Sequence, residues 1–276
     1  GGYLNMPIYN LMVWKLASGE VQCHWDIKNA IPRSIAISPD SRWLLSGTQG
    51  NGDIGEVNEL ALWDIQTCQL VRRFSMNGNE DVTGIAFSSD SRWAITGSAF
   101  VNPNRIILWD TETGEEIRRF TLATEGFRPI FDVTFGPGDQ TVLGADMDSL
   151  CLWDIETGEI IRRYTGLSSL PWSYAVSPDG KYILAGSDNN EVILWDFNTG
   201  QELYDLKVHP QTVYSVEFSP DSKTAFSVSN DGLLVQWNIS EKSLQEWIDW
   251  ISANRYLRPL TCAEKIQFRI DNTCQP

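Results

Sequence analysis

An apolar run that ends in Trp-Asp recurs along the chain. In LCLWDIETGEIIRRY, residues 150–164, this run is followed by a turn at Gly158 and by a second, more polar run. Related stretches surround five more tryptophans, and the complete series is Trp14, Trp63, Trp109, Trp153, Trp195 and Trp237. Successive members lie 42 to 49 residues apart. This regular spacing predicts a chain built from repeated structural units.

Each unit carries the pattern of several short strands. Residues 212–238, TVYSVEFSPDSKTAFSVSNDGLLVQWN, contain three apolar runs separated by the turn-forming clusters SPDS and SNDG. The runs are apolar at successive positions, which indicates strands that are covered on both faces. A period in the low forties with four short strands is typical of propeller blades, and one blade alone cannot cover both of its faces. We therefore predict an all-β propeller whose sheets stand radially and stabilise one another.

The second run of each unit is expected to be the outermost strand. Three successive units carry paired arginines there, at Arg72 and Arg73, Arg118 and Arg119, and Arg162 and Arg163. We expect these side chains to face solvent. Charged outer strands discourage pairing between sheet edges, and a basic belt is also able to bind an anionic partner. The pattern favours edge protection and leaves anion binding open.

In the order of their elements, these units resemble WD40 repeats. FSPDS-like, SNDG-like and LWD-like elements follow one another over residues 10–240. The resemblance implies a WD40-type β-propeller of six to seven blades, used as a rigid interaction platform without catalytic chemistry. It also implies a buried hydrogen-bonded tetrad, which the last repeat matches at His209, Ser227, Asp231 and Trp237. In the fifth repeat Ala185 and Asn189 take the Ser and Asp positions, so that tetrad is lost.

His209 and Asp231 also have the residue types of a catalytic dyad, but their positions in the repeat and the role of satisfied buried networks account for both. The chain has only two histidines, and it contains no Gly-x-Ser-x-Gly, no phosphate-binding Gly loop and no His-Glu-x-x-His. Its acidic turns lack the ligand spacing of an EF-hand. We predict no catalytic residue, no metal site and no cofactor.

Both ends depart from the repeat. After Trp237, SLQEWIDWISANRYL starts with a capping box at Ser243 and Glu246 and continues with apolar residues at helical spacing. We therefore expect a propeller over residues 1–242 and a helical cap over residues 243–276. The tail NRYLRPLTCAEKIQFRI resembles tails that follow propellers in large bacterial multidomain proteins, whose effector or NTPase modules lie upstream.

The first repeat is incomplete, because only nine residues precede its Trp14 strand, too few for two inner strands. An open ring would expose an apolar edge and a blade face. Either residues 1–9 and the tail complete this blade, giving six blades, or an upstream segment of a longer protein does so, giving seven. The second alternative is favoured, although propellers of four to eight blades leave the number open.

The net charge and the hydropathy of the chain restrict the classes of partner and the cellular location that we expect. A net charge of −15 at pH 7 is unfavourable for binding duplex nucleic acid, which requires a basic surface. A basic or neutral partner is easier to accommodate. No apolar run approaches the roughly 20 residues of a membrane helix, and GGYLNMPIYN lacks the order of a signal peptide. We therefore expect a soluble, cytoplasmic protein that binds neither nucleic acid nor membrane.

The five cysteines match neither a zinc pattern nor a disulfide framework. Cys23, Cys68 and Cys151 are expected to be buried as small apolar residues. Cys262 and Cys274 flank a short tail segment and are able to bridge, although a cytoplasmic location disfavours a disulfide.

We expect partner binding on the face where the family's d–a and b–c loops emerge. Residues 47–58 and 97–105 lengthen two of these loops, and long loops on a rigid scaffold often carry recognition. Trp, Phe and Arg are frequent interface anchors. The candidate partner-binding residues are Arg33, Phe100, Phe127, Arg128, Phe131 and Trp172, with Arg33 and Phe131 at the strand-a position that matches Trp172. Alternatively, Phe131 and Trp172 fill the core between blades and Phe100 folds back on its loop.

Three classes of function follow from these patterns. The first is a non-catalytic scaffold or sensor that binds a protein or peptide. It would be the C-terminal recognition domain of a larger bacterial signalling or defence protein, beside an upstream domain of the same chain. The second is a propeller that binds a small ligand at its central channel. The third is a propeller enzyme, which the missing motifs disfavour. We predict the first class.

Overall fold

A computed structural model of the chain describes residues 8–28, 31–49, 59–75, 81–99, 105–121, 129–146 and 149–239. The chain divides into two units, Gly1–Asn238 and Ile239–Pro276. The described part of the first unit holds β-strands and one short 3-10 helix, so the all-β prediction is confirmed. Within the described ranges, no helix has the length and apolar character needed to cross a membrane. The predicted helical cap at residues 243–276 lies outside these ranges, as do Cys262 and Cys274.

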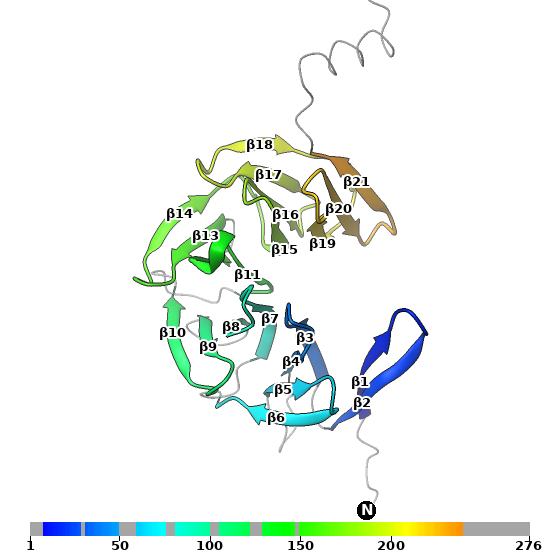
Figure 1. Ribbon diagram of the computed structural model, residues 1–276. Helices are drawn as coiled ribbons and strands as arrows, with labels where there is room; N and C mark the ends of the chain where they lie inside the picture. The colour runs from blue at the N-terminus through cyan, green and yellow to red at the C-terminus, as the bar shows by residue number, and fades with distance from the viewer. Residues whose placement is uncertain are drawn as a thin grey trace, which may run out of the picture. The chain divides into compact units, whose positions relative to one another are not determined.

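The strands form six antiparallel sheets that follow one another along the chain (Figure 1). Sheet I is a hairpin of β1 (Ile8–Lys15) and β2 (Glu20–Lys28). Sheet II contains β3 (Ile31–Ile37), β4 (Trp43–Gln49), β5 (Leu60–Asp64) and β6 (Gln69–Arg73). Sheet III contains β7 (Asp81–Phe87), β8 (Trp93–Ala99), β9 (Arg105–Asp110) and β10 (Glu116–Thr121).

The later sheets repeat this order. Sheet IV contains β11 (Val133–Phe135), the 3-10 helix η1 (Pro137–Asp139), β12 (Thr141–Asp146), β13 (Ser149–Asp154) and β14 (Ile160–Tyr164). Sheet V contains β15 (Pro171–Val176), β16 (Tyr182–Ser187), β17 (Val192–Asp196) and β18 (Glu202–Asp205). Sheet VI contains β19 (Val213–Phe218), β20 (Thr224–Ser229) and β21 (Leu234–Asn238).

Each sheet from II to VI is a meander whose first strand is innermost. The first strands of neighbouring sheets contact each other, with β7 against β3, β11 against β7, β15 against β11 and β19 against β15. These strands lie toward the middle of the arrangement in Figure 1, and β6, β10, β14 and β18 lie at its outside. The sheets are therefore arranged as the blades of a propeller, as the repeat predicts.

The SPDS-like clusters form tight turns between the first and second strands. In sheet III the hydroxyl of Ser88 donates to Oδ1 of Asp90 at 2.7 Å, and the same oxygen accepts from the backbone N–H of Arg92 at 3.0 Å. The hydrogen bond from Ser88 holds the pKa of Asp90 below its usual value. Ser91 completes the turn with a φ of 61°. A short polar side chain in each of these positions is what the turn requires.

The core lies between the sheets. Trp109, Trp153 and Trp195, on the third strands of sheets III to V, are 2%, 1% and 0% exposed. Trp195 packs in one cluster with Leu143 and Leu152 of the preceding sheet, so apolar residues on both faces of a strand are buried. The recurring tryptophan therefore fills space between two sheets, as expected for stacked repeats.

Neighbouring sheets approach so closely that one position on the second strand stays small. A Cβ atom on Gly47 would lie 2.4 Å from Cγ1 of Val82 in the next sheet, and one on Gly186 would lie 2.4 Å from Cγ1 of Val213. The equivalent residue in sheet VI is Val228, which pairs with Leu234 and is exposed.

The expectation that the paired arginines all face solvent is wrong for the first member of each pair and for Arg119, which is also half-buried. Arg72, Arg118 and Arg162 are half-buried and reach the turn between the third and fourth strands of the next sheet. Arg118, for example, donates to the carbonyl oxygens of Glu156 at 2.8 Å and Thr157 at 3.2 Å. A Cβ atom on Gly158 would lie 3.4 Å from Cδ of Arg118, so the aliphatic stem of the arginine also lies against the next sheet. We call this contact the arginine clamp.

The expectation of unbonded Cys23 and Cys68 is also wrong. The two residues form a disulfide between β2 and the β5–β6 turn, with their Cα atoms 5.4 Å apart. The five cysteines are odd in number and scattered in spacing, and spacing along the sequence does not report which residues the fold brings together. Cys151 is buried, as expected.

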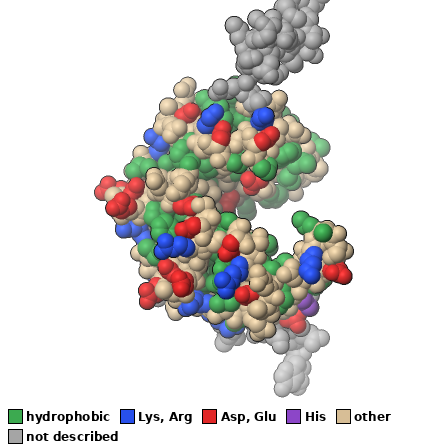
Figure 2. Space-filling view, in the orientation of Figure 1, with side chains coloured by type: hydrophobic (Ala, Val, Ile, Leu, Met, Phe, Trp, Pro, Cys, Tyr) green, Lys and Arg blue, Asp and Glu red, His purple; other side chains and the backbone are tan. Residues whose placement is uncertain are grey.

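The two ends of the sheet series are less covered than its middle. Trp14 of sheet I is 55% exposed, and Ile35 and Ile37 on the first strand of sheet II are each 53% exposed. In sheet VI, Leu234 is 66% exposed. Figure 2 shows open space between the hairpin β1–β2 and sheet VI. Among the described residues, sheet I has two strands where sheets II to V have four.

Candidate functional site

The first strand of four sheets contains one extra residue at its start. The pairing register shifts between Pro32 and Ser34, Val82 and Gly84, Pro171 and Ser173, and Val213 and Ser215. An extra residue that has no partner in the neighbouring strand is a β-bulge. The bulge bends the strand and turns the side chain of the extra residue out of the regular alternation between the two faces of the sheet. The extra residues, together with the matching residue of sheet IV, are Arg33, Thr83, Phe131, Trp172 and Tyr214. We call this series the bulge row.

Three aromatic members of the bulge row contact each other across three sheets. The rings of Phe131 and Trp172 are stacked, with centroids 4.4 Å apart and an interplanar angle of 6°. Trp172 meets Tyr214 edge to face at 5.7 Å. Phe131 and Trp172 are half-buried, and Tyr214 is 48% exposed. Contacts on both sides fix the Trp172 ring, which leaves a rigid aromatic surface at the start of β11, β15 and β19.

The structure brings together some of the predicted partner-binding residues. Phe131 and Trp172 lie face to face, as described. Arg33 is exposed in the equivalent position of sheet II, where its Nε donates to Oε1 of Gln49, and the smaller Thr83 of sheet III stands between it and Phe131 in the row. The candidates Phe100, Phe127 and Arg128 lie outside the described residues.

Tyr214 is a member of the row that the sequence analysis missed. A signal for it was present, because TVYSVEF aligns with LPWSYAV and puts Tyr214 in the place of Trp172.

A cavity of about 310 Å³ lies beside the residues that follow the row. Its polar lining comes from the first strands of sheets IV to VI and comprises Asp132, Thr134, Ser173, Ser215 and Glu217. Asp132 stands where sheets V and VI have Ser173 and Ser215, so sheet IV contributes a carboxyl group where these two sheets carry hydroxyls. The sequence analysis did not single out Asp132.

Asp132 fastens sheet IV to sheet V. Its Oδ2 accepts from the backbone N–H of Tyr174 at 3.1 Å, and its Oδ1 accepts from its own neighbour, Val133, at 2.9 Å. At the equivalent position, Oγ of Ser173 accepts from the backbone N–H of Val216 at 3.3 Å. Burial raises the pKa of Asp132 to about 7, against the opposing hydrogen bonds, and the negative charge of Glu217 adds to the increase.

The four residues of the predicted tetrad are hydrogen bonded in series. The indole N–H of Trp237 donates to Oγ of Ser227 at 2.9 Å, and Oγ of Ser227 lies 2.7 Å from Nε2 of His209. Nδ1 of His209 lies 2.8 Å from Oδ2 of Asp231. A consistent set of donors follows if Ser227 donates to Nε2 and Nδ1–H donates to the carboxylate. Burial favours the neutral form of Asp231, but the hydrogen bonds from His209 and Leu233 outweigh it and lower the pKa.

Although Ser, His and Asp stand in the order of a hydrolytic triad, the geometry is that of a structural network. Ser227 is 0% exposed, so no substrate carbonyl can approach its oxygen. That oxygen also accepts the indole proton of Trp237, which occupies a lone pair that a nucleophile would need. The same kind of hydrogen bond occurs in sheets II and III. The indole of Trp63 donates to the hydroxyl of Ser46, and the indole of Trp109 donates to the hydroxyl of Thr96.

Sheet V lacks such a hydroxyl, and Trp195 donates instead to the carbonyl oxygen of Thr165 at 2.8 Å. Ala185 pairs there with Ile193 and is fully buried. No group of three or more His, Cys, Asp or Glu side chains in the described ranges is placed to hold a metal ion.

Comparison with protein-family models identifies four segments of the chain. The model described as WD domain, G-beta repeat matches residues 18–54, 68–110, 158–196 and 200–238, which together make up more than half of the 276 residues. Sheet IV lies largely between the second and third matched segments and has the same strand order. Comparison with curated proteins found no match.

Proposed function

Since this chain belongs to the WD40-repeat family, whose propellers generally serve as scaffolds for protein interactions, we propose that it is a non-catalytic module that binds a protein or peptide through the bulge row. The observation that carries this proposal is the contact series Phe131–Trp172–Tyr214, which joins three sheets on one rigid surface.

The properties of this surface match those of interface anchors. Large aromatic side chains that are fixed before binding lose little conformational entropy when a partner packs on them. Arg33 adds a long cationic side chain at another position of the row. The partly exposed rings pack against one another between sheets and still leave surface for a partner, so the two alternatives raised by the sequence are compatible.

We propose a basic or neutral partner, because the chain carries a net charge of −15 and like charges raise the cost of association. That this module is the C-terminal recognition domain of a larger bacterial multidomain protein, next to an upstream domain of the same chain, stays a prediction from the sequence of the tail.

The cavity beside Asp132 favours a second candidate, a small-ligand sensor. A carboxyl group whose pKa lies near 7, beside hydroxyls and Glu217, would suit a polar or cationic ligand. Binding there would raise the thermal stability of the isolated chain with the logarithm of ligand concentration above the Kd, without any protein partner.

A peptide-display selection tests the leading proposal. The 276-residue chain is used to enrich peptides from a random library, and the affinity of selected peptides is then measured for the wild type and for Trp172→Ala. We expect the substitution to weaken binding at least about tenfold, the size of a modest hot spot. Trp14→Ala is the matched control, because Trp14 is an exposed tryptophan outside the row.

Selected peptides that bind Trp172→Ala and Tyr214→Ala as tightly as the wild type, with unchanged thermal stability of both variants, would contradict the proposed site. Peptides that lose affinity for Asp132→Ser alone would favour the cavity instead.

A further inference from the structure

The boundary between sheets I and II departs from the other boundaries in a coordinated way. At the next three boundaries, an arginine on the fourth strand reaches across to a glycine-containing turn. The arginine is opposite the residue that precedes the recurring tryptophan: Arg72 pairs with Leu62, Arg118 with Leu108 and Arg162 with Leu152.

Cys23 takes the arginine position in sheet I. It pairs with Val13, which precedes Trp14. Cys68 takes the glycine position in the turn of sheet II, five residues after Trp63, just as Gly114 lies five residues after Trp109. Cys68 keeps the left-handed backbone of that glycine, with a φ of 56° against 76° for Gly114. Two departures from the repeat therefore face each other across one boundary, and together they form a disulfide.

The glycine positions show how tightly the arginine clamp fits. A Cβ atom on Gly114 would lie 2.4 Å from Cδ of Arg72, and one on Gly200 would lie 3.1 Å from Cδ of Arg162. A side chain in the turn would therefore require the arginine on the neighbouring strand to move. Cysteine at both positions resolves this conflict, because the two short side chains join where the arginine would lie.

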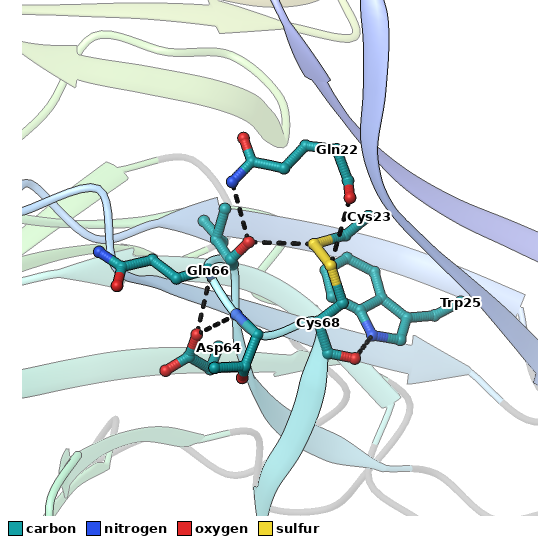
Figure 3. The surroundings of a disulfide bond; sticks show 8 residues. Gln22, Cys23, Trp25, Asp64, Gln66 and Cys68 are labelled. Carbon is teal, nitrogen blue, oxygen red and sulfur yellow. Dashed lines mark hydrogen bonds between the residues drawn. A yellow bond between two sulfur atoms is a disulfide. The ribbon is translucent and has the colours of Figure 1, made fainter.

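A backbone carbonyl oxygen lies beside each sulfur of the disulfide (Figure 3). Each oxygen is placed to accept a hydrogen bond from the thiol that forms when the disulfide is reduced. Sγ of Cys23 lies 3.0 Å from the carbonyl oxygen of Ile65, and Sγ of Cys68 lies 3.3 Å from that of Gln22. A disulfide sulfur carries no proton, so these contacts become hydrogen bonds only after reduction. The oxidised and reduced pairs therefore both fit the same backbone arrangement.

The hairpin of sheet I depends on this boundary. A hairpin of two strands is marginally stable by itself. Its contacts with sheet II include the ring pair of Trp25 and Trp63 at 5.2 Å, the bond from Nε1 of Trp25 to the carbonyl oxygen of Cys68 at 3.0 Å, and that from Nε2 of Gln22 to the carbonyl oxygen of Ile65 at 3.0 Å. The disulfide adds the covalent link at their centre.

We propose that Cys23 and Cys68 form a reversible redox clamp, in place of the arginine clamp, which fastens the hairpin β1–β2 to sheet II when oxidised and loosens it when reduced. A dithiol reductant supplies the two electrons and two protons. Its thiolate attacks Sγ of Cys68, which is half-buried, whereas Cys23 is 2% exposed. The S–S bond breaks, Cys23 leaves as a thiolate and takes a proton, and the second thiol of the reductant closes its own disulfide and releases Cys68.

The test uses the full chain with Cys262→Ser and Cys274→Ser, so that tail cysteines cannot exchange with the clamp. The protein is equilibrated with oxidised or reduced glutathione or with a dithiol, and thiols are assigned by alkylation and peptide mass spectrometry. Hydrogen exchange is then followed for peptides from β1 and β2. We expect exchange about 30-fold faster or more after reduction, the lower end of the usual effect of a disulfide. Peptides from sheets IV and V should not change.

The variant Cys23→Arg with Cys68→Gly rebuilds the arginine clamp of the other boundaries. We expect slow hairpin exchange that no longer responds to the reductant. Cys151→Ser should retain the redox response. If the rebuilt variant does not fold, the comparison of oxidised and reduced wild-type cysteines still decides the question. Alkylation of Cys23 and Cys68 after treatment with oxidised glutathione, or equal hairpin exchange in both states, would overturn the proposal.

Discussion

The middle of the sheet series and its two ends are built from the same repeat but differ in burial. Trp109, Trp153 and Trp195 are almost completely buried, whereas more than half of the surface of Trp14 is exposed. All four occupy the same position in their repeats. The two outer strands of a sheet, which are all that the hairpin β1–β2 has, therefore do not bury the recurring tryptophan by themselves. It is buried by the inner strands of its sheet and by the adjacent sheet.

Residues on the first strands of sheets II and IV show the same difference in burial. Ile35 and Ile37 of sheet II are exposed, while the equivalent Val133 and Phe135 of sheet IV are buried. In sheet IV, the preceding sheet III covers these residues, since a Cβ atom on Gly97 would lie 2.9 Å from Cγ1 of Val133. Sheet II is preceded by the hairpin of sheet I, which has no inner strands among the described residues.

Substituting tryptophan in the middle and at the end should produce the largest difference in stability. We expect Trp109→Ala to lower the free energy of unfolding by about 3–5 kcal/mol, because it removes a buried indole and leaves a cavity. Trp14→Ala should cost less than about 1 kcal/mol, because most of that side chain already contacts solvent. Urea denaturation of both variants measures the two values. Equal costs would mean that Trp14 is buried in solution.

The second difference concerns the close approach between sheets. Gly186→Val should lower the free energy of unfolding by about 1–3 kcal/mol, because the new side chain overlaps Val213. Val228→Ala at the equivalent position of sheet VI should change it by no more than about 0.5 kcal/mol, as for an exposed residue. A large cost at Val228 would show that another sheet packs against it.

The arginine clamp should contribute less than the core. Arg118→Ala removes two charge-assisted hydrogen bonds to solvent-accessible carbonyls and the packing of the stem, and should cost about 1 kcal/mol. Arg73→Ala is the control, because Arg73 is exposed and forms a surface ion pair with Glu59, a kind of contact that contributes about 0–1 kcal/mol. If Arg73→Ala lowered the free energy of unfolding more than Arg118→Ala does, the arginine clamp would not join the sheets.

The buried carboxyl group of Asp132 should also make stability depend on pH. The pKa of Asp132 is about 7 when folded and its ordinary value is 3.8, so the folded protein holds this proton more tightly. The contribution of Asp132 to stability is therefore most favourable below about pH 4 and declines as pH rises to about 7. The Tm of the wild type minus that of Asp132→Ser should fall by at least about 2 °C over this range. A constant difference would show that Asp132 titrates normally.

Much of the architecture follows from local sequence. The spacing of the tryptophans and the SPDS and SNDG clusters predict the sheets and their turns, because each feature acts within a few residues. The tetrad residues His209, Ser227, Asp231 and Trp237 are also found from their positions in one repeat, and they are hydrogen bonded in series.

Features between repeats were harder to predict. Whether Arg118 lies in solvent or against the next turn depends on the angle between two sheets, which no single repeat encodes. The disulfide carried a signal, since Cys23 and Cys68 replace the Arg and Gly of the neighbouring units, but this signal appears only when repeats are compared by strand register.

Hydrogen exchange along the whole oxidised chain tests most directly whether adjacent sheets, rather than each sheet's own ladder, stabilise the molecule. Amides of β16 and β17 in sheet V should exchange at least about 100-fold more slowly than amides of β1 and of β21. Within the described part of the chain, sheet V is the one of these three sheets that has a neighbouring sheet on each side. Equal protection of the three regions would contradict the account.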